Sequence, residues 1–244
     1  MAWDAAHAPV MQGFRPVEVH PMRSRPAELW IGAALGANLL LSAIILVVRG
    51  ADVHGTEAAL FATGRVAFLW FWAAYAGGAL TTLFGAAFLP LKQRGREFGL
   101  AFAAALLVHL ALVGWLCWNW RTPPIDVFIR FGTAAAFTLL LALFSFGNLH
   151  AVLGPKGWKL LRIIGMNYIL YAFLYDFMQN PLHGGVRRLV LYLPFAVMAI
   201  VAPLLRLAAW GIQADFLRTR TGIAAEAQCA RREFGCKNDP QQAR

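Results

Sequence analysis

The sequence predicts an all-α integral membrane protein: a bundle of six transmembrane helices with both termini in the cytoplasm. Hydrophobic residues make up 59% of the 244 residues and charged residues only 14%, whereas soluble domains average about 25% charged residues. The mean hydropathy is +0.57. The charges also lie between apolar runs of about 20 residues, the length that crosses ~30 Å of hydrocarbon.

Six apolar runs are the predicted helices, and no cluster of charges interrupts any of them. They cover residues 29–49, 66–90, 98–119, 127–149, 158–178 and 188–213. The chain therefore divides into a flexible cytosolic tail (1–27), a membrane domain (28–213) and a basic cytosolic tail (214–244). The first tail is rich in Pro and Arg and lacks the continuous apolar core of a signal peptide.

The distribution of Lys and Arg predicts the orientation. Fifteen of them lie in the two tails and in the connections 91–97 and 150–162, against six on the opposite side. Basic connections stay in the cytoplasm, so both termini are expected there. The net charge of +10 thus reflects membrane topology. Nucleic acid is not an expected partner, because no basic helix with interleaved aromatic residues is present.

One histidine, His109, lies inside a predicted helix, in the stretch GLAFAAALLVHLALVG (99–114). It follows Glu97 by twelve residues, or ~18 Å at 1.5 Å per residue, which places it slightly beyond the middle of the bilayer. Ionisable groups at that depth need a partner and often mark function. The imidazole could hydrogen-bond a neighbouring helix, ligate haem iron, or relay protons with Asp176, the acidic residue near the outer end of the fifth helix.

Three segments of the chain resemble a known family. RGREFGLAFAAALLVHLALVGW carries Arg96, Gly99 and His109 where that family has an Arg-rich loop, a glycine and, ten residues later, a haem-ligand histidine. ATGRVAFLWFWAAYAGGALTTLF and SFGNLHAVLGPKGWKLLRIIGMNYILYAFLYDF are similar to its second helix and to its fourth-to-fifth helix junction. Over roughly residues 60–210 the chain thus resembles the ferric-reductase-like transmembrane domain family. Within it, the likeness is greatest to the haem-binding membrane subunits of periplasmic methionine sulfoxide reductase systems.

The resemblance implies that His109 is an axial ligand of haem b. It also implies two further ligand positions on the fifth helix, but this chain has Arg162 at the first and Tyr175 at the second. Arginine stays protonated and is no ordinary ligand. The candidates for a second ligand are therefore Tyr175, Met166, one turn beyond Arg162, and His183, in the loop after the fifth helix.

The function implied by the resemblance is electron transfer through haem b in a multi-pass protein of the cell inner membrane. The electrons would come from quinol or from a flavoprotein, because the 31 residues after the last helix lack a Gly-rich phosphate loop. Two other functions remain open: a haem-free scaffold or assembly subunit with the same six helices, and a proton-coupled transporter that uses His109 and Asp176.

Overall fold

The computed structural model describes residues 25–120, 122–146, 149–179 and 185–237. These residues form seven α-helices and one short 3₁₀ helix, with no strand among them. The elements are α1 (Arg25–Arg49), α2 (Val53–Phe84), η1 (Gly85–Phe88), α3 (Leu89–Gln93), α4 (Gly95–Asn119), α5 (Ile125–Ser145), α6 (His150–Gln179) and α7 (Gly185–Lys237).

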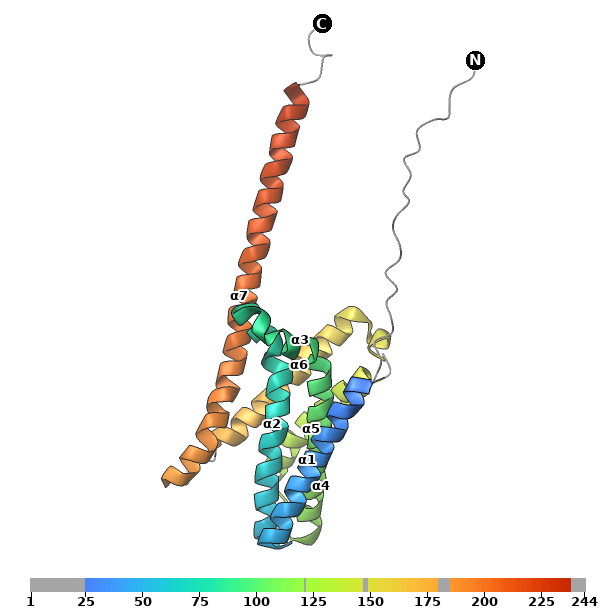
Figure 1. Cartoon of the computed structure of the whole chain (residues 1–244), viewed down its shortest axis with the longest axis vertical. Helices are drawn as coiled ribbons and strands as arrows, with labels where there is room; N and C mark the ends of the chain where they lie inside the picture. The colour runs from blue at the N-terminus through green and yellow to red at the C-terminus, as the bar shows by residue number, and fades with distance from the viewer. Residues whose placement is uncertain (1–24, 121, 147–148, 180–184, 238–244) are drawn as a thin grey trace, which may run out of the picture.

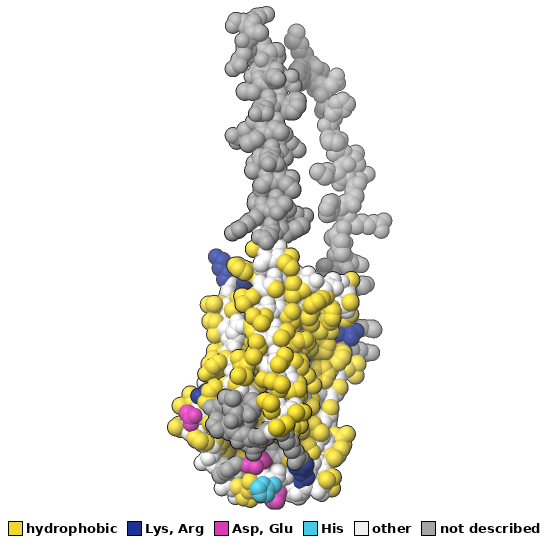
Figure 2. Space-filling view, turned by 90° about the vertical axis from the view of Figure 1, so that its left-hand side faces the viewer, with side chains coloured by type: hydrophobic (Ala, Val, Ile, Leu, Met, Phe, Trp, Pro, Cys, Tyr) yellow, Lys and Arg dark blue, Asp and Glu magenta, His cyan; other side chains and the backbone are white. Residues whose placement is uncertain are grey.

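Six helices of the described chain are long and apolar enough to cross a membrane, which confirms the predicted all-α bundle of six spanning helices. They are α1, α2 with its extension through α3, α4, α5, α6 and the first half of α7. They run alternately up and down, so that α1 begins and α7 ends on the same side of the bundle (Figure 1). Figure 2 shows a broad band of hydrophobic side chains on the viewed face, with charged and histidine side chains mainly near the two ends.

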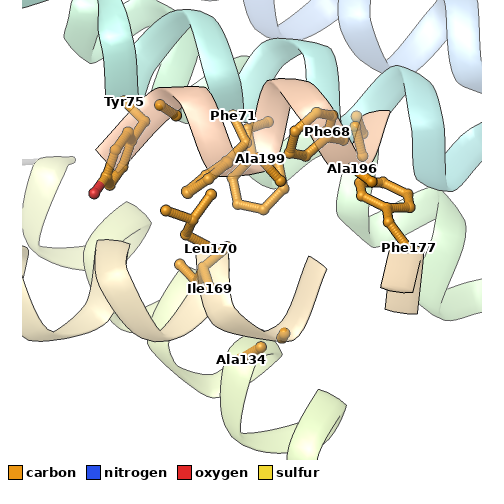
Figure 3. Packing of buried hydrophobic residues seen from close by; sticks show 14 residues of the cluster. Phe68, Phe71, Tyr75, Ala134, Ile169, Leu170, Phe177, Ala196 and Ala199 are labelled. Carbon is orange, nitrogen blue, oxygen red and sulfur yellow. The ribbon is translucent and has the colours of Figure 1, made fainter. Parts of the chain in front are cut away.

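Helix α2 lies at the centre of the bundle and packs against α1, α4 and α7. Helix α5 packs chiefly against α6 and less extensively against α4. The core follows from this arrangement: Phe68 and Phe71 of α2 are fully buried and meet aromatic rings of α6 at centroid distances of 5.0–5.7 Å. Figure 3 shows Phe68, Phe71 and Phe177 in this core, together with Ala196 and Ala199 of α7.

Alanines let α7 approach α2 closely. Ala196, Ala199 and Ala202 are 0–3% exposed, and their three-residue spacing places them on one helix face. Small side chains of this kind allow helix backbones to come together in a membrane, where dispersion contacts drive association. The Nε1 of Trp72 also donates a hydrogen bond to the carbonyl of Met198 at 3.0 Å, which joins the same two helices.

The structure differs from the prediction at the start of α2, which begins at Val53 instead of residue 66. The Asp52 side chain caps it by accepting from the Gly55 amide at 2.7 Å. Gly55 is required there, because a Cβ would lie 1.8 Å from the Gly50 carbonyl oxygen. The polar residues of this added segment lower its mean hydropathy, so hydropathy alone did not predict it as part of a membrane helix. His54, expected in a loop, therefore lies in the first turn of α2.

Helix α6 begins earlier than predicted, and helix α7 ends later than predicted. α6 begins at His150 but is kinked at Gly154, whose φ of 68° is left-handed. Glycine adopts this conformation readily, and Pro155 after it disfavours a helical residue at position 154. α7 continues as a helix to Lys237 beyond the bundle (Figure 1), and so covers most of the predicted C-terminal tail. The first 24 residues of the predicted N-terminal tail lie outside the described residues.

The contact between α2 and α7 predicts a large effect of Ala199→Leu. Three added carbon atoms at a fully buried position force the two helices apart, and such overpacking costs about 1–3 kcal/mol. Ala208→Leu on the exposed side of α7 is the matched control and should change the free energy of unfolding by less than about 0.5 kcal/mol. Reversible unfolding in mixed micelles measures both, and equal effects would contradict the packing described here.

Candidate functional site

His109 of α4 hydrogen-bonds Thr63 of α2, a residue 46 positions earlier in the chain. The Nδ1 of His109 lies 3.1 Å from the Thr63 Oγ1. The hydroxyl of Thr63 lies 2.8 Å from the carbonyl oxygen of Ala59 on its own helix. A hydroxyl has one proton, and we assign it to the carbonyl, the nearer of the two possible acceptors. Thr63 therefore accepts a hydrogen bond from His109 Nδ1–H.

This hydrogen bond selects the tautomer of the imidazole. When Nδ1 carries the proton of a neutral histidine, Nε2 carries the lone pair. The same arrangement, with one ring nitrogen donating to a protein oxygen, orients most metal-ligating histidines. With this assignment, His109 has the protonation pattern that a metal ligand requires. The sequence contained no sign of this partner, because Thr63 looks like any other small residue of an apolar helix.

Gly64 provides the space in which the imidazole lies. A Cβ on this glycine would be 3.3 Å from the Cε1 of His109 and 3.6 Å from its Nδ1. The first of these distances is tighter than ordinary van der Waals contact, so a side chain at position 64 would push against the ring. Thr63 and Gly64 together determine the position of His109, one by a hydrogen bond and the other by having no side chain.

His109 lines a cavity of about 1450 Å³, here called the large cavity. Side chains of α1, α2, α4, α5, α6 and α7 form its wall. This volume exceeds the ~300–1,000 Å³ of most small-molecule sites. The large cavity lies in the half of the bundle away from the chain termini, because its wall includes the first turn of α2 and the last turns of α4.

The wall of the large cavity is mainly apolar, with polar groups near one end. Its phenylalanines are Phe61, Phe102, Phe128, Phe131, Phe173 and Phe177. Its charged, histidine and tyrosine residues are Arg49, His54, Glu57, Arg65, His109, Asp176 and Tyr192. An apolar hollow with a few convergent polar groups is typical of a cofactor or ligand site.

Arg65 is the most constrained cation of this wall. Its guanidinium carbon lies 3.1 Å from the centroid of the Phe61 ring and 4.4 Å from that of Tyr192. It donates to the carbonyls of Phe61 at 2.9 Å and Leu191 at 3.3 Å. Its Nε is buried and has no hydrogen-bond partner in the described part of the chain. Because the predicted second helix begins at residue 66, Arg65 counted only as one of the six basic residues on the side opposite the termini, and nothing in the sequence indicated these contacts.

Two of the three predicted second ligands, Met166 and Tyr175, do not line the large cavity with His109. Met166 lines a different cavity of about 270 Å³, here called the small cavity, together with Arg162. Tyr175 is not among the residues of the large cavity wall that the structure describes; the Arg130 guanidinium lies over its ring at 3.4 Å. The Tyr175 ring also lies 6.3 Å from the ring of Tyr171, one turn earlier on α6. His183 lies outside the described residues.

Asp176, the acidic residue predicted as the relay partner of His109, also lines the large cavity. It lies close enough to Arg65 for their charges to interact. Within the described residues, no group of three or more His, Cys, Asp or Glu side chains is placed to hold a metal ion.

Comparison with models of known protein families, with curated proteins and with solved structures finds no match for this chain.

The role of Thr63 predicts coupling between Thr63→Val and His109→Ala. Valine keeps the shape of threonine but leaves the imidazole donor unpaired, which costs about 1–3 kcal/mol. In the His109→Ala background the same change should cost less than about 0.5 kcal/mol, because the donor is already gone. Thr63→Ser retains the acceptor and is the control. Additive effects in unfolding measurements on the two single variants and the double variant would disprove the hydrogen bond.

Proposed function

We propose that this protein is a membrane redox protein that carries haem b in the large cavity, with His109 as an axial ligand of the iron. The observation that supports this best is the imidazole itself, oriented by Thr63 in the wall of a cavity larger than most ligand sites. Haem, when bound, supplies a one-electron carrier in the membrane. This function is the one that the family resemblance implies.

The residues of the large cavity fit haem in three respects. A neutral imidazole with its lone pair on Nε2 is a normal ligand of haem iron, and haem iron takes its equatorial ligands from the porphyrin, so a single histidine suffices. The phenylalanines offer an apolar surface to a macrocycle and exclude water. Arg49 and Arg65 are cations that can pair with propionate groups, and the buried Nε of Arg65 has a donor still to satisfy.

The side chains of the chain itself have distinct tasks in this proposal. Thr63 holds the imidazole by accepting its Nδ1 proton, and Gly64 leaves room for the ring. Of the second-ligand candidates, neither Met166 nor Tyr175 lines the large cavity. The proposal therefore assigns His109 alone among the described residues to hold the iron.

The donor in this proposal is quinol or a separate flavoprotein in the cytoplasm. The fifteen Lys and Arg of the tails and of the two connections on the same side support an orientation with both termini in the cytoplasm of a cell with an inner membrane. The α3–α4 corner then presents Lys92 and Arg94, both exposed, to acidic groups of such a partner.

A proton-coupled transporter is the second candidate, and one observation favours it. His109 and Asp176, the two residues that the sequence suggested for a relay, line the same cavity. A polar end of a cavity inside a membrane bundle is also where transported groups bind. The two functions make different demands: the first needs the imidazole and a porphyrin, the second needs the carboxylate and a substrate.

The haem proposal predicts that the protein purified from cells with ample haem supply shows a Soret absorption band that His109→Ala abolishes. His54→Ala is the matched control, because His54 also lines the large cavity but lies in the first turn of α2. Met166→Leu and Tyr175→Phe should leave the spectrum unchanged. A colourless wild-type protein, as expected of a haem-free scaffold, would disprove the proposal; so would a band that survives His109→Ala.

The transporter alternative predicts proton-coupled flux in protein-containing liposomes. Asp176→Asn should abolish that flux, because the amide neither binds nor releases a proton at neutral pH, while Asp126→Asn near the start of α5 should preserve it. A pH-sensitive dye inside the liposomes measures the movement of protons. Flux that is equal in wild type and Asp176→Asn would exclude this mechanism.

A further inference from the structure

Three arginines from different helices gather at the other end of the bundle, away from the large cavity. Arg96 lies in the first turn of α4, and Arg162 lies in α6; both line the small cavity. Arg206 of α7 is close enough to Arg162 for the two positive charges to repel each other. Like charges held together in this way need an anion nearby to lower their repulsion.

The described part of the chain supplies no such anion to the small cavity. None of its described wall residues is Asp or Glu. Arg96 donates one hydrogen bond, to the carbonyl of Ser145 in the last turn of α5, which positions its guanidinium between α4 and α5. A guanidinium has five N–H donors in a fork that matches phosphate oxygens, so this one hydrogen bond leaves most of the fork for a ligand.

Apart from Thr138 and Ser145, the remaining wall of the small cavity is mainly apolar. Phe102, Leu141, Met166 and Ile169 line it, and two residues that face outward beside it, Leu140 and Ile163, are each 41% exposed. The first residue of α4, Gly95, also lines the cavity, and it begins a membrane span. The site is therefore at the level where lipid head groups meet the hydrocarbon, with cations above an apolar surface.

We propose that the small cavity binds the phosphate group of an anionic phospholipid, with Arg96 and Arg162 on the phosphate oxygens. The acyl chains then extend along the apolar surfaces of α5 and α6, which explains why this ligand is a lipid and not a free phosphate. Basic hollows between helices on the cytoplasmic side of membrane proteins bind acidic head groups in this way. The proposal does not depend on haem, because neither His109 nor Thr63 lines the small cavity.

Native mass spectrometry of the detergent-purified full chain tests the proposal. The probes are dioleoylphosphatidylglycerol, dioleoylphosphatidylcholine and sodium phosphate, each titrated onto delipidated protein. Wild type should retain one phosphatidylglycerol in preference to phosphatidylcholine. Arg162→Gln and Arg96→Gln should each weaken that binding about fivefold, the ratio that corresponds to ~1 kcal/mol per basic residue. Lys159→Gln, an exposed cation on the same helix that is absent from the cavity wall, is the control and should bind like wild type.

Each other outcome contradicts the proposal. Equal retention of the two lipids would show ordinary annular lipid, and equal losses in Lys159→Gln and Arg162→Gln would show attraction to general surface charge. Displacement of the lipid by millimolar phosphate would identify a free anion as the ligand. Melting temperatures of the variants establish that they fold. Arg162→Lys keeps the charge but not the fork, and it should bind with intermediate affinity.

Discussion

Polar side chains within this bundle must find partners inside the protein, because the hydrocarbon around it offers none. Most of them meet this constraint within their own helix: Asn38, Thr63, Thr138 and Asn167 each donate to the carbonyl four residues earlier, at 2.8–2.9 Å. An imidazole in α4 has no such local solution, and it reaches across to α2. The hydrogen bond between His109 and Thr63 thus joins two helices, and the orientation of the imidazole follows from it.

The packing around this contact explains why cavities exist beside a dense core. Helix α2 is held against α7 by alanines and against α6 by phenylalanine rings, while α4 packs closely on α1 and α2. Helix α5 follows α6 and contacts α4 less. The space between α4 and α5 is therefore filled incompletely, and the two cavities lie there, sharing Phe102, Thr138 and Ile169 in their walls. The large cavity carries histidine and charges of both signs, whereas the charges of the small cavity are all positive in the described residues.

The sequence predicted the membrane spans more accurately than it predicted the residues around His109. Long apolar runs located all six spans, with boundaries close to those observed for α1 and α4, because length and hydropathy are properties of one segment. The start of α2 was placed too late, since His54, Glu57 and Arg65 reduce the hydropathy of a segment whose helical start depends on the cap at Asp52. The candidates Met166 and Tyr175 were chosen by their position along α6, but the helix turns Met166 to the small cavity and Tyr175 toward Arg130 of α5.

The sequence by itself determined that this chain forms membrane-spanning helices, and it singled out His109 as the ionisable residue within one of them. Both conclusions follow from composition along a single segment. Only the tertiary structure decided that Thr63 and Gly64 hold the imidazole, that Asp176 and Arg65 share its cavity, and that Arg96 and Arg162 line one cavity. The residues of each set lie on different helices. Whether they come together depends on how side-chain volumes set the distances between neighbouring helices, and a local sequence pattern does not predict those distances.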